Sequence, residues 1–109
     1  MAKDLEIITK EEIEEMEQDN ERNLILLRNS LGRDFSSSRK TEITLAISNR
    51  MNLMELYSQY KDFLQMRGYL EKIREKYLGP ISEENMDKAF SFLEEEMNSI
   101  RKNINGYLI

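Results

Sequence analysis

Two groups of carboxylates are the residues of this chain whose type and spacing most suggest chemistry. They are Glu11, Glu12, Glu14, Glu15 and Glu17, followed much later by Glu94, Glu95 and Glu96. Paired carboxylates hold Mg²⁺ or act as acid and base when they converge in a pocket. Here the spacing places most of them on helix faces opposite the apolar residues, where water solvates them. We therefore predict no metal site, no cofactor and no catalytic residue among them.

The 109-residue chain contains neither His nor Cys. This composition removes the usual general base near neutral pH, the cysteine nucleophile and the commonest zinc ligands. The sequence also lacks a glycine-rich phosphate loop and a serine-nucleophile motif. We predict that the protein is not an enzyme.

The middle segment, residues 33–76, is rich in basic side chains with tyrosines between them. Such a combination binds single-stranded nucleic acid through phosphate contacts and base stacking. However, the bases scatter around the predicted helix circumference, and the net charge of the chain is −5. A nucleic-acid-binding regulator that uses Arg39, Lys40 and Arg50 is therefore an alternative, and a steep salt dependence of binding would identify it.

Charge is unevenly distributed along the chain. Residues 1–21 carry nine acidic and two basic residues, residues 22–80 carry six and eleven, and residues 81–109 carry six and three. We favour the interpretation that acidic outer helices balance a basic middle helix within one helical domain, residues 1–109. In the alternative interpretation, a charged patch faces a partner.

The first predicted helix begins after Thr9 and runs to Ser30 or Leu31. Thr9 and Glu12 fit a capping box, and Ile8 and Ile13 occupy the positions of a hydrophobic staple. Gly32 fits a left-handed helix stop. The apolar stripe consists of Ile13, Met16, Leu24, Leu27 and Leu31.

Two further features of this helix bear on how deeply it is buried. Asn20 falls inside the apolar stripe; it either fixes the register or marks where the stripe reaches solvent, and we favour solvent. The run Leu24–Leu27 is apolar on all sides, so we expect the second half of the helix to be more deeply buried than the acidic first half.

Residues 39–78 follow a loop, Gly32–Ser38, in which three serines offer N-caps. The apolar face moves around this segment: one set comprises Ile43, Ile47, Met54 and Tyr57, the next Leu53, Leu56, Tyr60 and Phe63, and the last Met66, Leu70, Ile73 and Tyr77. Either the helix breaks, or different partners cover different stretches. We favour a break near residues 49–52, with Asn52 as a new cap.

Residues 42–48 also fit a strand, which would need a partner strand.

The last predicted helix has the clearest stripe: Met86, Phe90, Leu93, Met97, Ile100 and Ile104. Ser82 is the expected N-cap, Gly106 the expected stop, and Tyr107-Leu108-Ile109 is expected to fold back on the last turn. Together the three stripes predict an all-α antiparallel bundle of three long helices, or four if the middle segment breaks.

The longest uninterrupted apolar run is four residues, Leu24 to Leu27, far too short for a membrane span. The first residues also lack the layout of a signal peptide. We expect a soluble cytoplasmic protein with no membrane partner. Eleven Ile and nine Asn against three Ala suggest an AT-rich bacterial or phage genome.

The function expected from these features is a non-enzymatic protein-interaction module, such as an inhibitor, adaptor or assembly factor. Its partner would be another protein or a second copy, because the moving apolar face exceeds what one chain can cover. The expected interface comprises Tyr57, Tyr60, Phe63, Met66, Tyr69, Tyr77, Tyr107, Leu108 and Ile109. Replacing Tyr60 and Phe63 with Ala is expected to weaken the complex without unfolding the protein.

Overall fold

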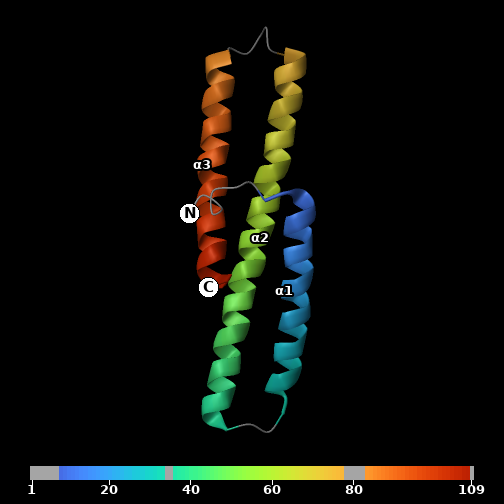
Figure 1. The fold of residues 1–109 in the computed structure, drawn as a ribbon, viewed down its shortest axis with the longest axis vertical. Coiled ribbons are helices and arrows are strands. Elements are labelled where there is room, and N and C mark those ends of the chain that lie inside the picture. The colour runs from blue at the N-terminus through green and yellow to red at the C-terminus, as the bar shows by residue number, and fades with distance from the viewer. Residues whose placement is uncertain (1–7, 34–35, 78–82, 109) are drawn as a thin grey trace.

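Three long helices make up the fold, as seen in a computed structural model that describes residues 8–33, 36–77 and 83–108 (Figure 1). Helix α1 spans Lys10–Leu31, α2 spans Ser37–Tyr77 and α3 spans Glu83–Leu108. Consecutive helices run antiparallel. The predicted all-α class with three helices is confirmed.

Helix α2 is the central helix of the molecule, and the other two helices pack at staggered positions along it (Figure 1). Helix α1 packs on the half of α2 that begins at Ser37, whereas α3 packs on the half that ends at Tyr77. At about 1.5 Å per residue, α2 is about 60 Å long, and the whole molecule measures 65 × 25 × 17 Å. Among the described helices, only α2 lies close to both others.

The core lies where the first turns of α1 and the last turns of α3 overlap on opposite flanks of the middle of α2. It consists of Ile13, Leu53, Tyr57, Tyr60, Met97, Ile100 and Ile104. Burying such side chains contributes roughly 1.5–3 kcal/mol each relative to exposure. The strongest packing is therefore central, and each end of the molecule is a pair of helices.

The predicted break near residues 49–52 is wrong, because α2 is one continuous helix. Asn52 does not cap a new helix; its amide nitrogen donates a hydrogen bond to the Tyr107 hydroxyl at 3.1 Å. The apolar face moves around α2 because different helices cover different stretches: α1 covers the first half of α2 and α3 covers the second. Residues 42–48 are helical, not a strand.

Some of the helix caps and stops that the sequence predicts are present in the structure, and others are not. Thr9 caps α1 by accepting a hydrogen bond from the Glu12 backbone N–H at 3.2 Å, and Ser36 accepts one from the Arg39 backbone N–H at 3.3 Å. Gly32, however, has φ −75°, so it is not left-handed. Gly106 lies in the last turn of α3 rather than just after the helix.

Tyr107 and Leu108 do not fold back on the last turn of α3 as predicted. Tyr107 and Leu108 continue α3, and both are exposed. Ile109 and the expected cap Ser82 lie outside the described residues. None of the helices in the described part of the chain is long and apolar enough to span a membrane.

Candidate interaction surface

Some residues of the predicted interface lie in the core, and others lie on the surface. Tyr57 and Tyr60 are core residues, 2% and 0% exposed, and Phe63 packs partly buried against them. A partner cannot reach Tyr57 or Tyr60 without opening the fold. The substitution Tyr60→Ala would therefore remove core packing, so it does not test an interface as the sequence suggested.

Tyr60 holds the three helices together through its hydroxyl. The oxygen accepts hydrogen bonds from the Ile8 backbone N–H at 2.9 Å and from Nη1 of Arg101 at 3.1 Å. Arg101 is itself only 6% exposed, and its Nη2 donates to Oδ1 of Asn98 at 3.3 Å. Because buried polar groups are costly unless paired, this arrangement is structural.

Met66, Tyr69 and Ile73 form an apolar stripe on the outer face of α2, which we name the α2 stripe. Met66 and Tyr69 are 48% and 58% exposed, and Ile73 is half-buried. The positions i, i+3 and i+7 place the three side chains on one side of the helix. Of the remaining predicted residues, Tyr77 closes α2, but its side chain lies outside the described part.

Helix α3 covers a neighbouring face of α2 and leaves the α2 stripe accessible. Arg74 pairs with Asp87 at 2.9 Å and lies over the Phe90 ring, 5.3 Å from its centroid, while Arg67 approaches Glu94 at 3.8 Å. At 100° per residue, the α2 stripe lies about a third of a turn from these two arginines. The second half of α2 therefore has two faces: α3 covers one of them, and the α2 stripe occupies the other.

Tyr107 and Leu108 expose a second apolar area at the end of α3. An open groove of about 540 Å³ runs beside them between α2 and α3. The described residues that line it are mostly polar: Asn52, Glu55, Leu56, Gln59, Lys102, Asn103, Gly106 and Tyr107. This groove suits water and polar contacts better than an apolar anchor.

The second half of α1 is less buried than predicted. Leu24 is buried, but Ile25 and Leu26 are 50% and 64% exposed, and Leu45 on α2 is 61% exposed. The reason is the stagger: only α2 lies beside this part of α1. Sequence reasoning identified the all-apolar run Leu24–Leu27 but could not show that just one side of it is covered.

Asn20 is buried rather than solvent-facing, contrary to our expectation, with 2% exposure. Its Nδ2 donates to the Arg50 backbone carbonyl at 2.8 Å, and its Oδ1 accepts a hydrogen bond from Nη1 of Arg50 at 3.4 Å. The polar residue in the stripe thus ties α1 to α2 at one position. It also engages the Arg50 guanidinium, which the nucleic-acid hypothesis needed free.

Other basic residues gather at the end where α1 and α2 meet. Arg28, Arg33, Arg39 and Lys40 are all exposed there. Arg50 lies ten residues beyond Lys40, about 15 Å along α2.

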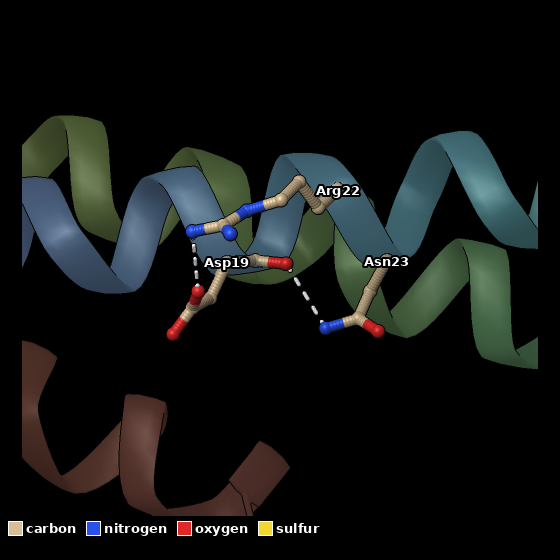
Figure 2. Close-up of polar contacts among 3 residues, drawn as sticks. All are labelled: Asp19, Arg22 and Asn23. Carbon is tan, nitrogen blue, oxygen red and sulfur yellow. Dashed lines mark hydrogen bonds and ion pairs between the residues drawn. The ribbon is translucent and has the colours of Figure 1, made fainter.

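The charged side chains of α1 differ in whether they have partners. Arg22 donates to Asp19 at 2.9 Å, and the Asn23 amide donates to the Asp19 backbone carbonyl at 2.9 Å (Figure 2). Glu17 accepts a hydrogen bond from Nζ of Lys61 across to α2 at 3.0 Å. Within the described part of the chain, neither Glu21 nor Arg28 makes an ion pair.

Two groups have shifted proton affinities. Burial raises the pKa of the Tyr57 hydroxyl, and the hydrogen bond to Glu17 raises the pKa of Lys61. Both groups lie in the contact between α1 and α2. Among the described residues, no three His, Cys, Asp or Glu side chains are grouped so that they could hold a metal ion.

No protein-family model matches this chain, and no significant match was found among curated proteins or solved structures.

Proposed function

We propose that this protein is a non-enzymatic interaction module that binds another protein through the α2 stripe. The observation that supports this proposal is the accessible set Met66, Tyr69 and Ile73 at positions i, i+3 and i+7. A helix recognised by a hydrophobic groove presents its anchors at this spacing. The partner is therefore a protein with an apolar groove.

Two further features support protein binding. Tyr is among the residues most enriched in binding hot spots, and Met adapts its shape to uneven surfaces. The α2 stripe also lies on a helix that α3 anchors through Arg67 and Arg74. Because the helix is already formed, binding does not have to order it. By general analogy, the role is that of an inhibitor, adaptor or assembly factor of bacterial or phage origin.

The test is affinity capture from cells that produce the protein, with the wild-type chain and the double variant Met66→Ala/Tyr69→Ala as baits. Both side chains are about half exposed, so the double variant is expected to keep its helix content by circular dichroism. We expect the captured protein to bind the double variant at least tenfold more weakly, a loss of about 1.4 kcal/mol or more.

The matched control is Phe92→Ala, which removes an exposed aromatic ring, 58% exposed, from α3. This variant is expected to capture the same protein as the wild-type chain. Equal retention by the double variant would show that the α2 stripe is not the binding site. Failure of the wild-type chain to capture any protein would argue against the module itself.

A second function has one specific observation in its favour: the exposed bases Arg28, Arg33, Arg39 and Lys40 share one end of the molecule. A regulator that binds nucleic acid through four phosphate contacts would lose affinity about fiftyfold for a single strand and about 150-fold for a duplex between about 50 and 200 mM salt. Fluorescence anisotropy with single-stranded and duplex oligonucleotides, for the wild-type chain and Arg39→Ala/Lys40→Ala, distinguishes the two functions. Apolar contacts through the α2 stripe would change little with salt.

A further inference from the structure

A groove of about 300 Å³ lies along the contact between α1 and α2, on the side of α2 that faces away from α3. Its lining residues are Glu17, Asn20, Glu21, Leu24, Ile25 and Arg28 from α1, with Met54 and Tyr57 from α2. We call it the α1–α2 groove. It shares no residue with the α2 stripe, so a role for this groove does not depend on the binding function proposed for that stripe.

The middle of the α1–α2 groove is apolar and only partly covered. Ile25 and Met54 are 50% and 45% exposed, although the run Leu24–Leu27 is apolar on all sides. A helix segment of that kind is stable in water when neighbours cover more than one of its sides. In this structure α2 covers one side, so a second cover is missing at Ile25.

Charges of opposite sign flank this apolar centre. Glu21 lies four residues before Ile25 and Arg28 three residues after it, and both are exposed. Neither forms an ion pair within the described part of the chain, whereas Asp19 and Glu17 nearby are paired with Arg22 and Lys61. The unpaired charges therefore stand on either side of the exposed apolar residues, one of each sign.

We propose that the α1–α2 groove is covered by the same groove of a second copy of this chain, with the two α1 helices antiparallel. A two-fold axis between Leu24 and Ile25 places Glu21 opposite Arg28 of the second copy, and Arg28 opposite Glu21 of the second copy. Such a contact is self-complementary, as a symmetric dimer requires. Ile25 and Met54 of both copies then fill the centre. A groove flanked by a single sign of charge would repel its own copy.

Charge reversal tests this arrangement. Sedimentation equilibrium of the full chain, from micromolar to about half-millimolar concentration, gives the dimer dissociation constant. Glu21→Arg and Arg28→Glu each bring like charges together twice in the dimer. We expect each single variant to raise the dissociation constant about tenfold or more. The double variant Glu21→Arg/Arg28→Glu restores both opposite-charge pairs, and its dissociation constant is expected to return to near that of the wild-type chain.

Two control variants change net charge equally at exposed positions on α3: Glu95→Arg matches Glu21→Arg, and Lys102→Glu matches Arg28→Glu. Both are expected to dimerise as the wild-type chain does. A wild-type chain that stays monomeric over the whole range would overturn the proposal. So would a dimer that ignores both single reversals, or a double variant as weak as the single ones, because another face would then hold the dimer.

A cross-link gives a second, independent measurement. The chain has no Cys, so Ile25→Cys introduces a single thiol next to the proposed two-fold axis. Mild oxidation is expected to link this variant into a covalent dimer, whereas Tyr69→Cys on the α2 stripe is expected to link far more slowly. Equal linking of the two variants would contradict the proposed axis. Because folding of each variant is checked by circular dichroism, a loss of helix cannot be mistaken for a loss of contact.

Discussion

The Tyr60 hydroxyl lies where all three helices come together. It accepts one hydrogen bond from the backbone N–H of Ile8, just before α1, and one from Arg101 of α3, while the ring is fully buried on α2. The single oxygen therefore satisfies two donors, one of them on a buried charged group. A charged donor left without its acceptor in the interior is costly.

Tyr60→Phe isolates the contribution of this oxygen, because the ring and its packing remain. We expect a loss of about 1–3 kcal/mol in the free energy of unfolding, measured by urea denaturation. The matched control is Tyr107→Phe, whose hydroxyl accepts a hydrogen bond from Asn52 at an exposed site. That variant should lose no more than about 0.5 kcal/mol. Equal losses in the two variants would show that burial of the Tyr60 oxygen is unimportant.

Alkaline pH should weaken the contact between α1 and α2. The pKa of Tyr57 is raised from 10.0 by burial and that of Lys61 from 10.5 by Glu17. Both groups hold their protons more tightly when folded, so their contribution is full below about pH 10 and is lost as the pH rises through the raised values. The urea midpoint should therefore fall above pH 10.

The variant Tyr57→Phe separates the tyrosine contribution from the rest of this pH dependence. Its urea midpoint is expected to fall less steeply above pH 10 than that of the wild-type chain. Tyr69→Phe, which alters an exposed hydroxyl, is expected to fall as the wild-type chain does. An unchanged slope for Tyr57→Phe would show that ionisation of this phenol is not coupled to unfolding.

At the scale of the helices, local signals were predictable and distant contacts were not. Thr9 was predicted as the cap of α1, and Met86, Leu93, Met97, Ile100 and Ile104 of the predicted α3 stripe are all buried. Both signals lie within a few turns of one helix. The continuity of α2 and the exposure of Ile25 depend instead on where α1 and α3 dock along α2. The sequence of residues 37–77 alone does not indicate where the other two helices dock.

The candidate surface was predictable to the same limited extent. Met66, Tyr69, Tyr107 and Leu108 were expected at an interface and are exposed, but Tyr57 and Tyr60 were also expected there and are in the core. Spacing places residues on a face of a helix; it does not tell which face a neighbour covers. The α1–α2 groove was missed because its two flanking charges become meaningful only beside Met54 from another helix.

Gly68 offers a prediction about α2 itself. It lies inside the helix, and a Cβ added there meets no atom within 4 Å. Gly68→Ala is expected to raise the free energy of unfolding by about 0.5–1 kcal/mol, because Ala is the better helix former and strains nothing. Gly106→Ala, in the last turn of α3, is expected to gain less, since helix ends fray. A loss of stability in Gly68→Ala would mean that α2 bends at this position.

At the scale of the whole molecule, the stagger of the helices determines how much surface remains apolar. The radius of gyration is 18.6 Å, whereas a compact domain of this length has one of about 13 Å. In this elongated arrangement, all three helices meet only at the centre, and each end of the molecule is a pair of helices. A pair of helices cannot enclose its own apolar side chains. Exposed Ile25, Leu45 and Tyr69 result from this geometry, and Ile25 and Tyr69 belong to the two surfaces proposed for binding.

The same geometry predicts a gradient of local stability along α2. Native-state hydrogen exchange should find the slowest amides near Leu53–Tyr60, where helices pack on both flanks, and faster exchange toward Ser37 and toward Tyr77, where only one helix does. The side chain of Ile104 is fully buried in the central core. Ile104→Ala should therefore lower the stability by about 2–5 kcal/mol and speed exchange most in the middle of α2. Uniform protection from one end of α2 to the other would contradict this prediction, because it would mean that the helix pairs at the two ends are as firmly held as the centre.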